Sequence, residues 1–301
     1  MTPALNEVDM FEVADGKSVR FQGATPRLYS DLLTAEVNGK GVLDVDTVKG
    51  CTAGMGARPN GGCYNACYAA TIAKFRGIDF SRSVVRHVRS KFQALKIEKA
   101  VRESPYGFFR IGTMGDPCHA WLHTVEVVEW LAPFATPVII TKHWVKALDQ
   151  HLSRLVACGT VLNTSISALD TPAELAYRER QIDRYEKLGG VSVSRIVSCD
   201  FNRSHPEGGR MAVTQDRLFA LKNVIDNPLR IPRTHDLFRR GVVRLSSVKD
   251  LDSVRTVSLA KPDTYLGHCR DCPDQCGLSV RKHGHPQPKA PQQQLFNRGF
   301  I

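Results

Sequence analysis

Short apolar runs alternate with longer segments of helical periodicity through the middle of this 301-residue chain. The apolar runs predict strands over 41–48, 107–115, 136–142, 161–167 and 193–202. Segments with apolar residues every three or four positions predict helices over 82–103, 125–134, 147–159, 172–190 and 215–225. Strands and helices in this alternating order form βα units and place the strands in a parallel sheet.

This alternation predicts an α/β fold built on a full or partial (β/α) barrel of parallel strands, with a doubly wound open sheet as the alternative. The pattern divides the chain into an N-terminal extension, a barrel-like core and a cysteine-rich C-terminal extension, over 1–40, 41–260 and 261–301. In either fold the ligand site lies at the carboxyl ends of the strands, so the residues that follow each strand are the first to inspect.

The composition of the chain indicates its cellular compartment and the chemistry of its cysteines. The N-terminus lacks a signal-peptide pattern and no apolar run is long enough to span a bilayer, so we expect a cytoplasmic protein without a membrane partner. Structural disulfides are rare in a reducing cytosol, and the nine cysteines are an odd number. Clustered cysteines in such a chain are therefore expected to be metal ligands.

The chain is basic, with a formal net charge of +11 and a pI near 9.3. Residues 74–110 contain ten Lys or Arg against three Asp or Glu. Such a surface favours an anionic partner, either nucleic acid or a phosphorylated small molecule, and a merely solvated basic face is an equal alternative. Arg82, Arg86 and Arg89 recur at helical spacing and are predicted to share one helix face.

The first cysteine group lies in the loop after the first predicted strand. Cys51, Cys63 and Cys67 have the spacing C-x11-C-x3-C in "CTAGMGARPNGGCYNAC", whose glycines allow it to wrap around a bulky centre. Three thiolates suit a [4Fe–4S] cluster with one iron left open, whereas structural zinc usually takes four protein ligands. Three buried thiols are the alternative, since free cysteines often occupy cores.

The second cysteine group is near the C-terminus, in "HCRDCPDQCG". Cys269, Cys272 and Cys276 are too dense and too polar a group to arise from core packing, so they predict a metal site. With His268 or His283 they would form a zinc site, and with a remote cysteine an auxiliary [4Fe–4S] cluster, which we favour.

Three further cysteines stand alone. Cys158 lies in a predicted helix before a C-cap glycine and is interpreted as a core residue. Cys118 and Cys199 fall at the ends of predicted strands, so each is a candidate catalytic thiol or extra ligand. A small residue lining a pocket is an equally good interpretation of both.

These motifs together resemble the radical S-adenosylmethionine (SAM) superfamily. The common motif of that family is C-x3-C-x2-C after the first barrel strand, and this chain departs from it with its wider spacing. The "CYA" at 67–69 is similar to the end of that motif in spore photoproduct lyase-like proteins and in a phage-borne branch. "RIGTMGDP" (110–117) is similar to the second-strand motif, often written GGEP.

The resemblance implies a set of SAM contacts after successive strands. "IITK", "TSISALD" and "VSCDFN" resemble the third, fourth and fifth strand motifs of the family. Asp116 would pair with the SAM ammonium group. The complete set of implied cofactor contacts is Gly115, Asp116, Lys142, Ser165, Ser167 and Asn202.

The function implied by the resemblance is that of a radical SAM enzyme. A [4Fe–4S] cluster would cleave SAM and generate a 5′-deoxyadenosyl radical for hydrogen abstraction from a small-molecule or peptide substrate. The basic net charge of the chain favours an anionic substrate. A reductase, flavodoxin or ferredoxin would supply the electron. A zinc-containing nucleic-acid-binding protein and a non-catalytic Fe–S carrier or scaffold are the alternatives.

Overall fold

A seven-stranded sheet forms the centre of the computed structural model. The model describes residues 26–55, 67–229, 231 and 233–245, with the short segments 11–12, 18–19, 248–250, 256–258, 272 and 275–282. The spatial order of the strands is β11 (Val224–Asp226), β10 (Val191–Ile196), β9 (Val161–Ile166), β8 (Thr136–Thr141), β7 (Phe108–Ile111), β4 (Leu43–Asp44) and β3 (Glu36–Val37). All neighbours pair in parallel except β3 and β4, so the chain has an α/β fold with a mostly parallel sheet.

Helices alternate with these strands along the chain. The α-helices are α1 (Tyr68–Phe75), α2 (Lys91–Arg102), α3 (Trp121–Leu131), α4 (Asp149–Ala157), α5 (Pro172–Lys187), α6 (Pro206–Phe219) and α7 (Asp236–Arg239). Short 3-10 helices are η1 (Ala53–Met55), η3 (Pro117–Ala120) and η5 (Gln275–Lys282). Three small antiparallel pairs are β1 (Phe11–Glu12) with β2 (Ser18–Val19), β5 (Val48–Lys49) with β6 (Val84–Val85), and β12 (Val248–Asp250) with β13 (Thr256–Ser258).

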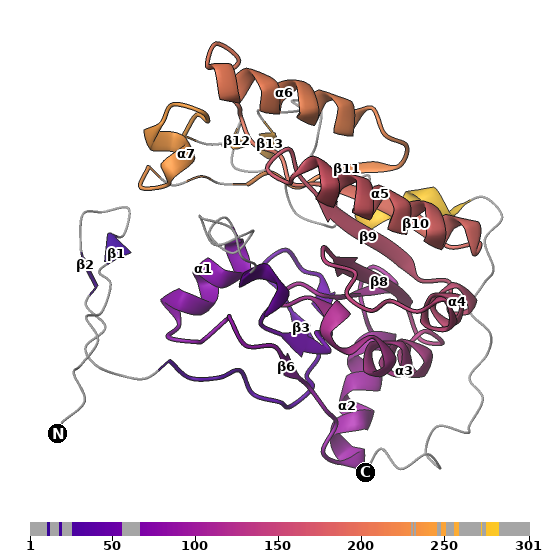
Figure 1. The fold of residues 1–301 in the computed structure, drawn as a ribbon. Coiled ribbons are helices and arrows are strands. Elements are labelled where there is room, and N and C mark those ends of the chain that lie inside the picture. Colours follow the sequence, from indigo (N-terminus) through magenta and orange to yellow (C-terminus); the bar gives the residue numbers. More distant parts are fainter. Residues whose placement is uncertain are drawn as a thin grey trace.

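Different elements pack on the two faces of the sheet. Phe109 and Leu162 point to the face where the buried side chains of α2, α3, α4 and α5 pack, which we call the helix face. Phe108 and Val161 point the other way and pack with residues of η5, so we call that side the η5 face. Figure 1 shows the colours advancing in order from β3 and α1 through α3 and α4 to α5 and α6.

The strand order bears on the two predicted architectures. A doubly wound sheet reverses its strand order at one point and has helices on both faces. Here β4, β7, β8, β9, β10 and β11 follow one another without reversal. This order is compatible with a partial (β/α) barrel, and within the described residues β3 and β11 are the two edges of an open sheet.

Most central elements match the sequence prediction closely. The strands predicted over 136–142 and 161–167 are observed as β8 and β9, and the helices predicted over 147–159 and 172–190 as α4 and α5. A capping box between Thr171 and Glu174 begins α5, because each side chain satisfies a free backbone N–H of the other. These elements were predictable because their periodicity and their caps agree.

The predicted helix over 82–103 was too long. Ser90 caps α2, which starts only at Lys91, and β6 upstream pairs with β5 instead of continuing the helix. The prediction that Arg82, Arg86 and Arg89 share a helix face was therefore wrong. Arg86 is buried, and its guanidinium donates to the carbonyl of Asp46 at 3.3 Å.

Two boundaries around α6 also differ from the prediction. The helix predicted over 215–225 begins at Pro206 and ends at Phe219, while the predicted strand 193–202 ends at Ile196. The glycines in its first turns lower helix propensity and hide this start. Gly208 is required there, since a Cβ would lie 2.4 Å from the carbonyl oxygen of Asn202.

The C-terminal segment η5 packs on the η5 face across β9 and β10. The Asn163 amide donates to the carbonyl of Cys276 at 3.0 Å, and Leu278 joins the apolar cluster of that face. Gly277 has φ +93° and lies so close to the sheet that a Cβ would be 2.4 Å from the Val193 Cγ2 atom. Cys276 of the second cysteine group is thereby attached to the sheet.

None of the helices in the described part of the chain is long and apolar enough to cross a membrane. Of the predicted extensions, residues 1–10 and the tail from 283 onward lie outside the described residues.

The packing of η5 can be tested with a matched pair of glycines. Gly241 also has a positive φ of +71°, but a Cβ there would meet nothing within 4 Å. We expect Gly241→Ala to cost about 1–2 kcal/mol of backbone strain, and Gly277→Ala to add the clash with Val193 and release the C-terminal segment. Limited proteolysis beyond residue 258 should accelerate in Gly277→Ala alone. Equal proteolysis rates in the two variants would contradict the observed packing.

Candidate functional site

The first cysteine group lies where the chain leaves β5 and enters α1. Cys51 donates its backbone N–H to the carbonyl of Phe80 at 2.8 Å, and Cys67 is the N-cap residue of α1. Both cysteines belong to one apolar cluster with Ala69, Ala70 and Phe80. Cys63 lies outside the described residues, in the segment that joins these two positions. The loop therefore brings its first and last cysteines to the same small cluster.

The thiol of Cys67 has a mixed electrostatic environment. Burial raises its pKa, while the backbone N–H groups of Ala70 and Ala69 and the charge of Lys142 act in the opposite direction. Helix N-termini and nearby cations stabilise thiolates. The net pKa of Cys67 is raised, so the free side chain is a protonated thiol, and the same N–H groups and Lys142 would stabilise a thiolate at this position.

Metal-ligating side chains do not converge in groups of three within the described residues. Two members of each predicted cysteine triad lie in the described part of the chain, and the third members, Cys63 and Cys269, lie outside it. Cys51 also interacts electrostatically with the thiol of Cys118, which extends the thiol-rich region toward β7.

Asp116, after β7, accepts four hydrogen bonds. Its Oδ1 accepts from the Cys118 N–H at 3.0 Å and the Thr141 hydroxyl at 2.7 Å, and its Oδ2 from the N–H groups of Lys142 at 2.8 Å and His143 at 3.1 Å. Burial acts to raise the pKa of this carboxyl, but the charge of His143 and these hydrogen bonds outweigh it and lower the pKa.

Asp116 therefore joins the end of β7 to the end of β8. All four acceptor positions of its carboxylate are used. A SAM ammonium group would have to replace one of these donors or share an oxygen with it. Its role as a SAM contact stays a prediction.

A second buried carboxylate, which the sequence analysis missed, orders the neighbouring loop. Asp46 accepts from the N–H groups of Gly112, Thr113 and Met114, at 2.8, 2.8 and 3.0 Å, and from the Thr113 hydroxyl at 2.8 Å. Burial, together with the nearby charge of Asp44, raises its pKa. Asp46 thus holds the backbone that leads from β7 to Asp116.

Gly115 has a packing role in this loop. It forms a bridge with Gly50, and a Cβ at Gly115 would lie 2.5 Å from the carbonyl oxygen of Val48 and 2.8 Å from that of Gly50. This close backbone approach brings the loop after β7 against the residue preceding Cys51. This close packing by itself explains why position 115 requires a glycine.

The other predicted SAM contacts also have protein partners, with one exception. Lys142 forms an ion pair with Asp170 at 2.8 Å. The Ser167 hydroxyl donates to the carbonyl of Val197 at 2.9 Å. Asn202 donates to the carbonyl of Gly241 at 3.0 Å.

Ser165 is the exception, because its hydroxyl forms no hydrogen bond with another described residue. It lies on the η5 face, at the carboxyl end of β9, and is partly buried. Of the predicted contacts that carry a side chain, Ser165 is therefore the one without a hydrogen-bond partner among the described residues.

The two candidate catalytic thiols are deeply buried. Burial and the charge of Asp116 raise the pKa of Cys118, and burial raises the pKa of Cys199 to about 12. The backbone of Cys199 exchanges two hydrogen bonds with the side chain of Gln215. Both residues are therefore neutral thiols near pH 7, and neither is an activated thiolate nucleophile.

Tyr68 was missed although it belongs to the "CYA" motif. Its hydroxyl donates to the carbonyl of Thr113, and burial of the hydroxyl raises its pKa to about 12, although the residue as a whole is 52% exposed. The hydroxyl also interacts electrostatically with Arg195 on β10 and with Arg110 on β7. One side chain next to Cys67 thus comes within electrostatic range of two separated strands.

Cys276 of the second cysteine group lies within electrostatic range of Arg110. Arg110 interacts electrostatically with both Tyr68 and Cys276. Cys272 and Cys276 are partly buried, and Cys269 lies outside the described residues. Arg110 thereby links the neighbourhoods of the two predicted centres.

His119 is a further residue that the sequence analysis missed. Its Nε2 accepts the backbone N–H of Ala53 at 3.3 Å, directly after Cys51. Burial lowers the pKa of His119, which keeps the ring neutral and able to accept this bond. Its position two residues after "GDP" was the available signal.

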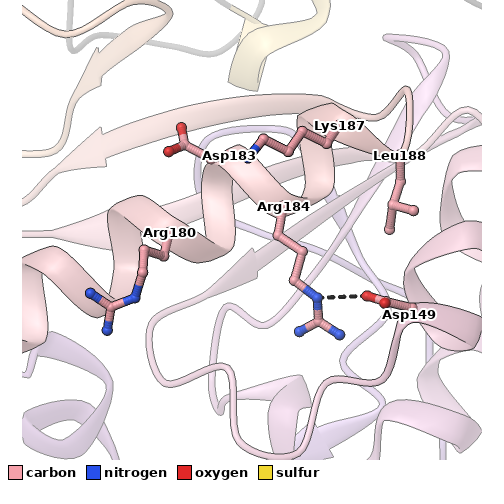
Figure 2. Close-up of a pocket in the computed structure, with 6 residues that line it drawn as sticks. All are labelled: Asp149, Arg180, Asp183, Arg184, Lys187 and Leu188. Carbon is pink, nitrogen blue, oxygen red and sulfur yellow. Dashed lines mark hydrogen bonds and ion pairs between the residues drawn. The ribbon is translucent and has the colours of Figure 1, made fainter.

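A shallow hollow elsewhere does not belong to this site. Figure 2 shows it between α4 and α5, where Arg184 pairs with Asp149 at 2.6 Å. It has a volume of about 400 Å³ and is lined by Asp149, Arg180, Asp183, Arg184, Lys187 and Leu188. Its residues come from the helix layer and include none of the predicted ligands.

Comparison of the chain with protein-family models, with curated proteins and with solved structures finds no match.

The role of Asp116 predicts a pH-dependent stability. Asp116→Asn removes a charged acceptor and should destabilise the protein by about 3 kcal/mol at pH 7. The pKa of Asp116 is lowered in the folded state, so its contribution is present above the unfolded pKa of about 3.9 and is lost as pH falls through the folded pKa.

The difference in unfolding free energy between wild type and Asp116→Asn should therefore shrink as pH falls below about 4. Denaturant titrations at several pH values measure it, with the exposed Asp183→Asn as a control that changes stability by no more than about 0.5 kcal/mol. A difference that is independent of pH would contradict the assignment.

Proposed function

We propose that this chain is a radical SAM enzyme with a partial (β/α) barrel core. In this proposal Cys51, Cys63 and Cys67 hold a [4Fe–4S] cluster at the carboxyl end of the sheet, and SAM binds beside it. The C-terminal cysteines hold a second Fe–S cluster. The electron comes from a reductase, a flavodoxin or a ferredoxin.

The observation that carries the proposal is the meeting of Cys51 and Cys67. Sixteen positions apart in the sequence, they join one apolar cluster at the carboxyl edge of a parallel sheet. Ligand sites in parallel α/β folds lie at this edge. The third cysteine lies on the loop between them, so the three thiols fit the donor set of a cluster with one open iron.

The chain's own residues define what this site can do. When bound, the reduced cluster would supply one electron to the sulfonium of SAM, whose C–S bond would break to give methionine and the 5′-deoxyadenosyl radical. The loop cysteines orient it, the N–H groups at the start of α1 and the charge of Lys142 stabilise thiolate at Cys67, and the apolar residues around them exclude water. Asp46 and Asp116 keep the loops that border the site in one arrangement.

The experiment is anaerobic reconstitution, followed by iron and zinc counting and a dithionite-dependent assay for 5′-deoxyadenosine. Cys67→Ala and Cys63→Ala should abolish 5′-deoxyadenosine formation and remove about one cluster's iron, because an open-site cluster needs all three thiolates. Cys276→Ala should remove iron from the second centre only. Cys158→Ala, at the end of α4, is the matched control and should retain all iron.

Each alternative has its own outcome. Zinc without iron would favour the zinc-containing nucleic-acid-binding protein. Iron without SAM cleavage would favour an Fe–S carrier or scaffold. Loss of both centres in Cys67→Ala would contradict the division of the six cysteines into two sites.

A further inference from the structure

The η5 face changes character along β9 and β10. Near the start of the strands it is apolar, with Val161 and Val193 covered by η5. Near their carboxyl ends it is polar, where Ser165 and Arg195 are register partners on the two strands. The segment η5 covers the apolar half of this face. The polar half lies next to the carboxyl ends of the strands.

Of the basic side chains Arg110, Lys142 and Arg195 around this face, the first two are paired with a carboxylate and the third is not. Arg110 is paired with Asp44 through two contacts, at 2.8 and 3.2 Å, and Lys142 is paired with Asp170 at 2.8 Å. Arg195 has a neutral partner instead, the amide oxygen of Asn227 at 2.8 Å. Within the described residues no carboxylate forms an ion pair with Arg195, so one guanidinium is left without a compensating charge.

A partly buried cation of this kind is costly unless an anion joins it. A guanidinium also presents several donors in a fixed plane that matches the oxygens of a phosphate or a carboxylate. The Ser165 hydroxyl beside it has no partner among the described residues, and the Tyr68 hydroxyl lies within electrostatic range. These groups are the components of an oxyanion site.

We propose that Arg195 and Ser165 bind a phosphate or carboxylate group of the substrate at the carboxyl half of the η5 face. Ser165 then contacts the substrate, whereas the family resemblance implies that it contacts SAM. In the sheet, β7, β8 and β9 lie between Arg195 and β4, the strand that leads to the first cysteine group. An anionic group bound at Arg195 is therefore separated from the cysteine loop by the width of these three strands, and the substrate would extend from Arg195 toward that loop. The substrate assignment rests on the proposed function, whereas the oxyanion site itself does not.

Inorganic phosphate is the probe, with binding to the full chain followed by calorimetry or phosphorus NMR. Arg195→Gln should weaken phosphate binding at least tenfold, and Arg195→Lys should restore part of it, which separates lost charge from lost folding. Ser165→Ala should weaken binding severalfold. Arg203→Gln is the control: this exposed arginine is paired with Asp216, and its loss should change the affinity less than twofold.

Two results would overturn the oxyanion site: a wild-type protein that binds no phosphate, or equal weakening in Arg195→Gln and Arg203→Gln. S-adenosylhomocysteine binding tests the source of the anion. An unchanged affinity in Arg195→Gln supports the substrate, while a loss as large as that for phosphate assigns Arg195 to SAM and overturns the proposal. If no variant or wild type binds S-adenosylhomocysteine, the proposed function fails while the phosphate result stands.

Discussion

The arrangement of the candidate site depends on buried carboxylates that take their hydrogen bonds from loop backbone. A carboxylate removed from water is tolerated only when protein donors replace the lost solvent. Asp116 meets this condition with donors from η3 and from the end of β8, and Asp46 with the backbone that follows β7. These hydrogen bonds hold the loops at the carboxyl ends of the strands in one arrangement.

This constraint extends to the first cysteine group. Because the backbone after β7 is held by Asp46, Gly115 can approach Gly50 closely enough for the two to form a bridge. Cys51 follows Gly50 directly, so its position is determined by the same contact. The cysteine loop is thus anchored at one end by backbone packing and at the other by the start of α1.

The sequence predicted the central βα units because strand and helix periods differ and because caps such as that of α5 mark their ends. It could not predict the start of α2, since β6 forms only through its pairing with β5, a contact invisible in local periodicity. The start of α6 was missed for a related reason. Gly208 lowers helix propensity locally, and its benefit arises from the distant backbone of Asn202.

The sequence places the candidate site at the carboxyl ends of the strands and in the cysteine loop, and this position stays a prediction. The pattern did not reveal that the carboxylate of Asp116 accepts four hydrogen bonds from the protein, because those donors come from η3 and from the end of β8. It also passed over Arg195, although a charged residue within the buried strand "VSVSRI" is itself an unusual signal.

Arg110 interacts electrostatically with Tyr68, the residue after Cys67, and with Cys276 of the second cysteine group. The central claim is that the first group holds a cluster with an iron open to SAM. Electron paramagnetic resonance of the dithionite-reduced protein, recorded before and after SAM is added, tests this claim most directly. We expect the signal of the reduced [4Fe–4S] cluster to change when SAM binds the open iron. A cluster signal that SAM leaves unaltered, or the absence of any cluster signal, would contradict the account.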